Sequence, residues 1–261
     1  MTNSEKFFQP LSPPPAIRLS RVNLSYEGSV LFHDLDLELP AGRVSVLLGP
    51  SGVGKSSLLR LIAGLEVVEG GGSVEFIVSG GQVFDRAVTP PAYMAQQDLL
   101  LPWLDALGNV ILGQRLRSDT PDRSRARDLL ARVGLDNYAH ARPAALSGGM
   151  RQRVALARTL MEARATVLMD EPFSALDAVT RLRLQELATK LLRGRTILLV
   201  THDPMEALRL GECIFIMSGR PAQLTEVPSP VGKTPRDPAD VEFLTHHAEL
   251  LSRLGAAEAG F

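Results

Sequence analysis

Four residues in the stretch 49–56 have the types and spacing needed to bind a polyphosphate. Gly49, Gly54, Lys55 and Ser56 complete the pattern GxxxxGKS, with the apolar segment VSVLL before it and the apolar helix pattern SSLLRLIAGL after it. Glycines let such a loop turn its backbone N–H groups onto phosphates, the lysine reaches the β and γ phosphates, and the serine hydroxyl ligates magnesium. The sequence therefore predicts an MgATP-binding loop at the start of a helix.

Two adjacent carboxylates follow a second apolar strand pattern. In ATVLMDEP, Asp170 and Glu171 lie at the C-terminal end of the strand, the edge where ligands bind in open parallel sheets. Asp170 suits a hydrated magnesium ion, and Glu171 suits the general base that orients an attacking water. His202 follows another strand pattern, TILLV, and is expected at the same edge. Alone, the acids could simply cap the sheet, and a histidine in this position is more often an ordinary loop residue.

A second helix start could also bind an anion. In LSGGMRQRVALARTLM, Ser147 is a good N-cap, and Gly148 and Gly149 leave backbone N–H groups exposed. By itself this is an ordinary helix start, and its meaning depends on the other motifs.

The composition describes a folded and nearly neutral chain. It has 261 residues, a formal net charge of −1 and 45% hydrophobic residues, so it can bury a core, and its net charge does not attract nucleic acid or an anionic membrane. The single cysteine, Cys213, cannot form an intrachain disulfide and lies in an apolar strand pattern, which fits a reducing compartment. No stretch reaches the ~20 apolar residues of a membrane span, so we expect any membrane role to act through a partner.

Strand and helix patterns alternate along most of the chain, which is typical of an α/β fold. Residues 1–15 are rich in proline and are expected to form a disordered tail. Residues 97–160 carry helix patterns, including one at 104–117, and no convincing strand, so they are expected to form an inserted helical subdomain. Residues 231–261 are expected to form a helical tail, which leaves 16–230 as the nucleotide-binding domain. Strands are expected at IRLSRVNLSY, LFHDLDLEL, VSVLL, SVEFIV, AYM, ATVLM, TILLV and CIFIM.

Five motifs, in order, resemble those of the ATP-binding subunits of ABC transporters. GPSGVGKSS resembles the Walker A loop, LSGGMRQR the signature, VLMDEP the Walker B strand, SALD the D-loop and VTHD the switch-histidine segment of that family. The resemblance covers residues 17–226. It implies a P-loop NTPase core with a parallel sheet, an N-terminal antiparallel β-subdomain and an inserted α-helical subdomain. It also implies ATP and Mg²⁺ as ligands, and ATP hydrolysis coupled to transport.

The resemblance assigns roles that spacing alone does not give. Tyr26 matches the aromatic that stacks on adenine, Gln96 the glutamine that touches magnesium and the attacking water, and His202 the histidine that holds the γ-phosphate. Glu171, His202, Gln96 and Lys55 are the implied catalytic residues, and Ser56, Gln96 and Asp170 the implied metal ligands. The implied nucleotide-binding residues are Tyr26, Gly49, Pro50, Ser51, Gly52, Val53, Gly54, Lys55, Ser56, Ser57, Ser147, Gly148, Gly149 and Asp177.

The same resemblance predicts the partners. Signature residues complete the site of the opposite subunit in this family, so two copies are expected to enclose two ATP molecules head to tail. The segment DLLLPW at 98–103 resembles ATPases of importers for nitrate, sulfonates, taurine and thiamine-precursor pyrimidines, where it meets the permease. Leu101, Pro102 and Trp103 are therefore expected in that contact, with packing inside the helical subdomain as the alternative.

The expected partners are a second copy of the chain, integral permease subunits and, indirectly, a solute-binding protein, with no nucleic acid. The expected location is peripheral, on the cytoplasmic face of the inner membrane, and the solute is expected to be small and anionic or pyrimidine-like. Export of a lipid or drug remains open. A soluble cassette ATPase of DNA repair or translation would share these motifs, but such relatives usually carry coiled coils, zinc modules or two cassettes. An unrelated P-loop kinase would leave the signature and Gln96 unexplained.

Overall fold

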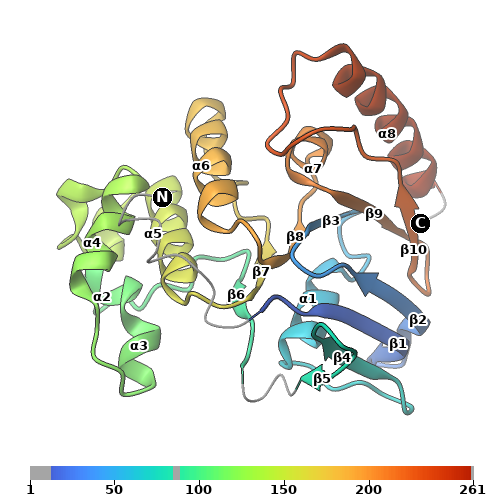
Figure 1. The fold of residues 1–261 in the computed structure, drawn as a ribbon, viewed down its shortest axis with the longest axis horizontal. Coiled ribbons are helices and arrows are strands. Elements are labelled where there is room, and N and C mark those ends of the chain that lie inside the picture. Colours follow the sequence, from blue (N-terminus) through green and yellow to red (C-terminus); the bar gives the residue numbers. More distant parts are fainter. Residues whose placement is uncertain (1–12, 85–88, 260–261) are drawn as a thin grey trace.

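The structure is a computed structural model that describes residues 13–84 and 89–259 (Figure 1). Its first strands form a four-stranded antiparallel sheet in the order β2-β1-β4-β5. Alternating burial along β1 and β2 turns one face of this sheet toward the core. The predicted antiparallel β-subdomain is therefore confirmed. Its strands are β1 (Ala16–Tyr26), β2 (Ser29–Leu39), β4 (Ser73–Ile77) and β5 (Val83–Phe84).

The second sheet has six strands in the order β10-β9-β3-β8-β7-β6. All neighbouring pairs are parallel except β10 with β9, which is antiparallel. Its central strands are almost fully buried, as expected for short apolar strands covered on both faces. The predicted parallel sheet is confirmed. Its strands are β3 (Val44–Leu48), β6 (Ala92–Met94), β7 (Thr166–Asp170), β8 (Thr196–Val200), β9 (Cys213–Ser218) and β10 (Gln223–Val227).

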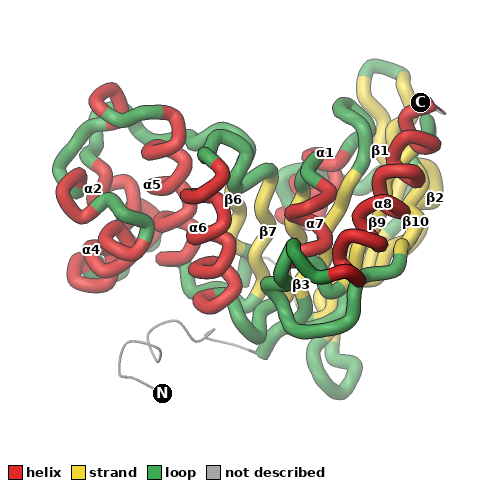
Figure 2. The backbone as a smooth tube through the Cα atoms, turned by 90° about the horizontal axis from the view of Figure 1, so that it is seen from above, coloured by secondary structure: helices red, strands yellow, loops and turns green. Residues whose placement is uncertain are grey.

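The chain between β6 and β7 is helical and gathers at one end of the molecule in both ribbon and tube views (Figures 1 and 2). The other helices pack on the large sheet or extend beyond it. The helices are α1 (Lys55–Ala63), α2 (Ala106–Val110), α3 (Leu112–Leu116), α4 (Arg123–Arg132), η2 (Asp136–Tyr138), η3 (Pro143–Ala145), α5 (Gly148–Met161), α6 (Ala178–Leu191), α7 (Pro204–Leu210) and α8 (Val241–Ala259).

Two elements differ from the sequence expectations. The helix pattern at 104–117 is interrupted at Ile111, whose φ of −86° and ψ of 3° are not helical, and it forms two short helices, α2 and α3. Strands β5 and β10 were not predicted, because the segment around Val83 is short and β10 is exposed along most of its length. Neither strand shows the buried alternation on which strand prediction depends.

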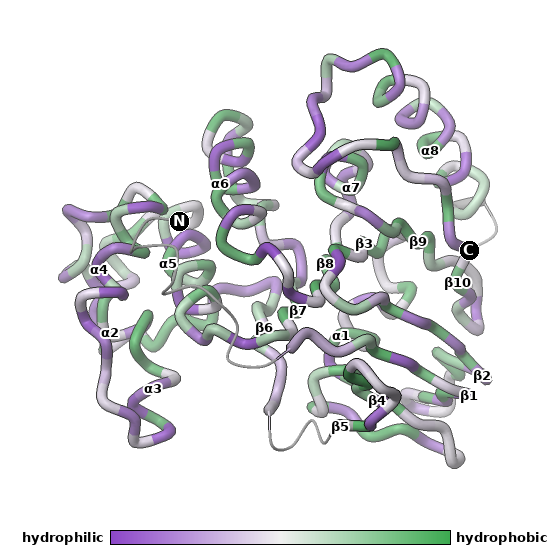
Figure 3. Tube along the Cα trace, viewed as in Figure 1, coloured by the Kyte–Doolittle hydropathy of each residue, from purple (hydrophilic) through white to green (hydrophobic). Residues whose placement is uncertain are grey.

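Two apolar clusters hold the fold together. One lies between the small sheet, α1 and the large sheet, and the other runs from the large sheet through the helices between β6 and β7. Figure 3 shows hydrophobic and hydrophilic stretches alternating along β1 and β2, and further hydrophobic stretches on several helices. Both clusters include residues of the central strands, so the large sheet is the common support of the two halves.

The ends of the chain are attached to this support in different ways. The carbonyl of Pro15 accepts a hydrogen bond from the Thr196 hydroxyl at 2.5 Å, whereas residues 1–12 of the predicted disordered tail lie outside the described residues. At the other end, α8 packs on α7 and β9 and buries Phe243 and Leu250. The described part of the expected helical tail therefore contains one helix, α8, with one face buried on the rest of the protein. Among the described residues, none of the helices is both long and apolar enough to cross a membrane.

Candidate active site

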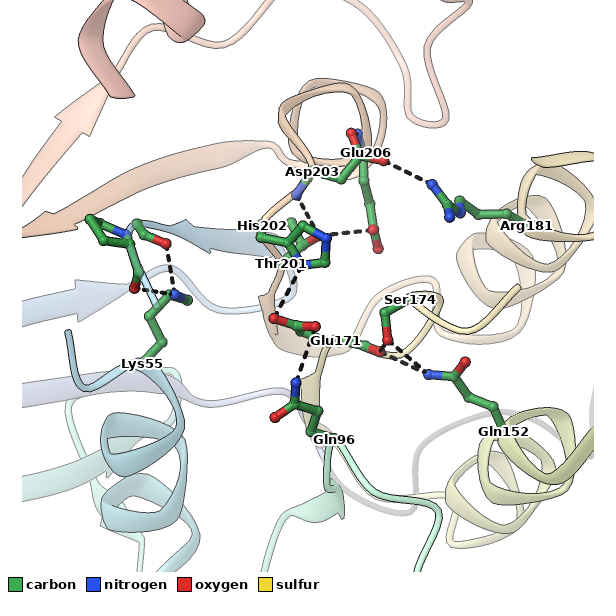
Figure 4. Close-up of polar contacts among 12 residues, drawn as sticks. Lys55, Gln96, Gln152, Glu171, Ser174, Arg181, Thr201, His202, Asp203 and Glu206 are labelled. Atoms are coloured by element: carbon green, nitrogen blue, oxygen red, sulfur yellow. Dashed lines mark hydrogen bonds and ion pairs between the residues drawn. The ribbon is translucent and has the colours of Figure 1, made fainter. Parts of the chain in front are cut away.

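The predicted phosphate loop lies between β3 and α1, at the C-terminal edge of the large sheet. Gly54 is the N-cap of α1 in a left-handed conformation, with φ of +112°. Lys55 is buried, and its Nζ donates to the carbonyl oxygens of Gly49 and Pro50, at 2.7 Å each. The ammonium group is therefore folded back over the loop, as Figure 4 shows.

Gly49 is the one position of this loop where backbone and space both require glycine. Its φ is +150°, and a Cβ there would collide with the carbonyl oxygen of Met217 on β9. Both the backbone strain and the collision exist only in the folded state. Any side chain at position 49 therefore lowers the stability of the fold and displaces the loop.

We expect Gly49→Ala to lower the free energy of unfolding by about 2–4 kcal/mol and to abolish ATP binding, because the loop must shift away from β9. Chemical denaturation and nucleotide titration measure the two effects. Gly255→Ala is the control, since Gly255 is exposed on α8 with no atom within 4 Å of an added Cβ. It should leave stability unchanged or slightly higher, and equal stability of both variants would contradict the prediction.

Asp170 ends β7 inside the protein and faces the phosphate loop. Burial raises the pKa of Asp170, and a hydrogen bond with the Ser56 side chain opposes this rise. Burial lowers the pKa of Lys55, while the charges of Glu171 and Asp170 raise it. A hydroxyl beside a buried carboxylate provides the hard oxygen ligands that Mg²⁺ prefers, so these residues fit the predicted metal.

Glu171 lies at the centre of the cluster shown in Figure 4. Its Oε2 accepts a hydrogen bond from Gln96 Nε2 at 3.3 Å, and its Oε1 lies 3.2 Å from His202 Nδ1. Its backbone is left-handed (φ 47°) and its N–H donates to the Val200 carbonyl at 2.9 Å. The carboxylate is 17% exposed and the histidine 62%. Three residues predicted from separate motifs thus meet at one sheet edge, with a carboxylate sheltered from water and held by two side chains.

Gln152, on α5, joins this cluster although the sequence analysis did not single it out. Its Nε2 donates to the Glu171 carbonyl and its Oε1 accepts from the Ala175 N–H, both at 2.9 Å, while the Ser174 hydroxyl donates to the same carbonyl at 3.0 Å. A glutamine on the otherwise mostly apolar buried face of this helix is the signal that could have identified it. The signature helix, the D-loop and the acidic strand end are therefore hydrogen-bonded to each other.

A second link missed from sequence joins the D-loop to the segment after His202. Arg181, on α6, donates to Asp203 Oδ2 at 3.0 Å and to the Leu176 carbonyl at 3.2 Å. Asp203 in turn is the N-cap of α7 and accepts from the backbone N–H groups of that helix. Arg181 therefore links the D-loop to the loop that contains His202, so a displacement of one loop would displace the other.

The remaining predicted residues lie at helix starts away from this cluster. Ser147 caps α5, accepting from the Met150 N–H at 3.2 Å, and Asp177 caps α6, accepting from the Thr180 N–H at 2.9 Å. That hydrogen bond lowers the pKa of Asp177. A Cβ at Gly149 would lie 3.1 Å from the Ala175 carbonyl. Helices α5 and α1 lie on opposite sides of β6 and β7 in Figures 1 and 2, so the structure does not bring the signature to its own phosphate loop.

Tyr26, the predicted adenine-stacking residue, ends β1 with 38% of its surface exposed. Its hydroxyl donates to Glu66 at 2.8 Å and accepts from Arg60 at 3.2 Å. The ring is thus held beside α1, the helix that follows the phosphate loop, and its role toward adenine stays a prediction.

Known proteins are similar to this chain in sequence and in fold. The family model described as ABC transporter matches residues 32–174. An uncharacterized ABC transporter ATP-binding protein of Haemophilus influenzae is 41% identical, over 93% of this chain and 100% of the relative. The chain belongs to the ABC transporter family. A Pseudomonas syringae pv. tomato protein named as the aliphatic sulfonates import ATP-binding protein SsuB 2 is 43% identical, over 90% of this chain and 96% of the relative.

Solved structures agree with this assignment. The ATP-binding cassette MJ0796, in a dimeric post-hydrolysis state bound to ADP and Pi, has a TM-score of 0.70 and 29% identity, over 85% of this chain and 99% of that chain. A second dimeric structure of MJ0796, described as a bacterial ABC transporter cassette, has a TM-score of 0.68 and 28% identity, over 82% and 99% of the two chains. This ABC protein therefore binds nucleotide and is an ATPase.

Proposed function

We propose that this ABC ATPase works as a homodimer that encloses two MgATP molecules and drives solute import through a membrane permease. The observation that carries the proposal is the sheltered carboxylate of Glu171, held between Gln96 and His202 beside the phosphate loop. A carboxylate oriented from both sides can accept a proton from one defined water molecule, as hydrolysis of ATP requires.

In this proposal each part of the site has one task. Backbone N–H groups of residues 51–56 and the ammonium of Lys55 bind the phosphates, Glu171 is the general base, and His202 holds the γ-phosphate. Ser56 and Asp170, with Gln96, would hold Mg²⁺, which would neutralise charge on the phosphates when bound. Tyr26 would stack on the adenine.

Dimerisation follows from the separation of the two anion-binding helix starts. The signature at the start of α5 and the phosphate loop at the start of α1 both suit a phosphate, yet they lie apart in one chain. A head-to-tail dimer would bring Ser147, Gly148 and Gly149 of one copy to the nucleotide of the other. The dimeric cassette bound to ADP and Pi supports dimerisation and nucleotide binding.

The permease contact is proposed at the loop that follows Gln96. Its backbone is tightly held: Arg158 donates to the carbonyls of Asp98 and Leu99 at 2.7 and 2.9 Å, and Arg151 pairs with Asp98 at 2.9 Å. The buried side chain of Asn109, on α2, hydrogen-bonds backbone groups of residues 101–105, which come directly after this part of the loop. A loop fixed so firmly is a defined surface and not a mobile connection.

Despite this support, the same loop exposes large apolar side chains. Leu99 is 59% exposed with a left-handed backbone (φ 46°), and Trp103 is 67% exposed. A strained leucine and a tryptophan held in water are costly for the free chain and favourable at an interface core. Arg151 lies on α5, the signature helix, and pairs with Asp98 in this loop, so a displacement of the loop would also displace α5.

We expect the double variant Leu99→Ala, Trp103→Ala to lose at least tenfold in recovery of a multi-span membrane protein. Hydrolysis by the isolated chain should change by less than about twofold, because neither side chain touches the Glu171 cluster. The measurement is affinity purification from detergent-solubilised membranes of the native host. Leu244→Ala is the control, since Leu244 on α8 is similarly exposed, at 51%, and should retain the membrane protein.

The same purification separates the competing functions. Nucleic acid recovered in place of a membrane protein would favour a cassette ATPase of repair or translation. For the solute, the relatives named for aliphatic sulfonates import support a small anionic cargo, with a pyrimidine-like cargo as the second possibility within the proposal. A peripheral position on the cytoplasmic face of the membrane, next to the permease, completes it. A solute-binding protein would be an indirect partner.

A further inference from the structure

A buried carboxylic acid lies one helical turn beyond the switch histidine, and none of the motifs accounts for it. Glu206 is in the first turn of α7 and only 5% of its surface is exposed. Figure 4 shows it on the far side of Thr201 from the catalytic cluster. A glutamate so deeply buried requires either a partner charge or a proton.

The contacts of Glu206 lead directly to the histidine loop. The Thr201 hydroxyl donates to Glu206 Oε2 at 2.9 Å and accepts from the Asp203 N–H at 3.1 Å. The Thr201 N–H donates to the Leu47 carbonyl on β3 at 3.2 Å. One threonine, fixed by Glu206 and by the strand before the phosphate loop, therefore sets the backbone on both sides of His202.

The surroundings of Glu206 favour its neutral form. Oε1 is buried and has no hydrogen-bond partner within the described part of the chain. Burial, together with the charges of Asp203 and Glu171, raises the pKa of Glu206 to about 8, against the opposing effects of the Thr201 hydrogen bond and of Arg181 on α6. A neutral acid leaves one hydroxyl unpaired, which costs far less than an unpaired buried charge.

We infer that Glu206 is a positioning residue, which acts as a neutral acid and holds the His202 loop through Thr201. The inference rests on the proposed role of His202 at the γ-phosphate. Ionised Glu206 would add a buried negative charge behind a loop that must approach both Glu171 and a polyphosphate. ATP turnover should therefore depend on the proton of Glu206, a group that is neither the substrate nor the general base.

The expected pH dependence follows from the direction of the shift. Between the ordinary pKa of 4.5 and about 8, the unfolded chain has lost this proton and the folded chain keeps it, so the free energy of unfolding falls as pH rises through that range. Above about pH 8 Glu206 ionises in the folded chain as well, so this group no longer makes the free energy of unfolding depend on pH. The neutral form of Glu206 that positions the His202 loop is then lost. The kcat for ATP hydrolysis should be about tenfold lower at pH 9 than at its plateau.

The test compares Glu206→Gln with Glu206→Ala in the full-length chain. Glutamine keeps the shape and the acceptor for Thr201 without a proton to lose, so it should hold the pH 7 rate within about twofold. Its rate relative to wild type should rise about tenfold between pH 7 and pH 9, and its stability advantage should grow between pH 5 and pH 8. Alanine should lower kcat about tenfold at pH 7 with KM for ATP nearly unchanged. Glu249→Gln, an exposed change on α8, should follow wild type throughout.

Thr201 offers a second pair of variants. Thr201→Val removes the hydroxyl at constant shape and should lower kcat as Glu206→Ala does, whereas Thr201→Ser keeps the bond and the rate. A constant ratio of Glu206→Gln to wild type at every pH overturns the inference, as does an unchanged kcat in Glu206→Ala. His202→Ala is measured alongside. If it keeps the wild-type rate, the proposed function fails; if it is inactive while the Glu206 variants behave as wild type, only the present inference fails.

Discussion

We expect Glu171→Gln to lose at least two orders of magnitude in ATP turnover while still binding ATP, and to accumulate as a nucleotide-bound dimer. Glutamine matches glutamate in size, so Gln96 and His202 still find an oxygen on one side of the group. It carries no negative charge and cannot accept a proton from water, so the general base is lost while the size of the side chain is kept. Closed dimers therefore form and do not reopen by hydrolysis.

Steady-state phosphate release measures the turnover, and size-exclusion chromatography with and without ATP measures the dimer. Glu249→Gln removes the same charge at an exposed site on α8 and should leave both measurements unchanged. Hydrolysis by Glu171→Gln at the wild-type rate would show that another group takes the proton. A monomeric, ATP-bound variant would instead contradict the composite site.

The position of Glu171 was predictable, but the means by which it is held was not. Carboxyl ends of parallel strands share one edge, so the residues after β7 and β8 had to lie near each other. That rule brings Glu171 and His202 together from two patterns that are distant in sequence. It does not reveal the left-handed backbone at Glu171 (φ 47°), which aims the side chain. A strained non-glycine residue leaves no mark in an amino-acid pattern.

The supporting residues were missed for a related reason. Gln152 and Arg181 bond backbone carbonyls of the acidic strand end and the D-loop, at positions 19 and 5 residues away. Backbone groups are the same in every residue, so spacing and residue type do not show such pairs. Glu206 was passed over because a glutamate in the first turn of a helix usually serves the helix dipole in water. Its burial comes from the packing of α7 against the sheet and α8.

The fold shows the same limit at its periphery. Strands that are buried on both faces have continuous apolar patterns, and these were all located. Within residues 13–84 and 89–259, β10 pairs only with β9 and is largely exposed, so its residues carry no such pattern. The break between α2 and α3 at Ile111 likewise left no signal in the helix pattern at 104–117.

The composite site predicts that two inactive chains can restore each other. Lys55→Ala removes the ammonium that binds the phosphates, and Ser147→Arg places a bulky cation where the signature should meet the nucleotide of the other copy. Each homodimer then has two defective sites, and we expect ATP turnover at least a hundredfold below wild type for either variant alone. Both substitutions fall at helix starts, where a change can lower the stability of the helix. Thermal unfolding should therefore be measured to confirm that each variant chain is folded.

In a mixed dimer the two lesions fall together on one site. The phosphate loop of the Ser147→Arg chain is intact and faces the intact signature of the Lys55→Ala chain, so one of two sites is whole. Random mixing makes about half of the dimers mixed, and the recovered turnover should reach at most about a quarter of wild type. If each chain instead completed its own site, mixing would restore nothing, because every copy would carry its lesion with it. Phosphate release from the mixture, with mixed dimers verified by native mass spectrometry, therefore decides between a shared and a self-contained site.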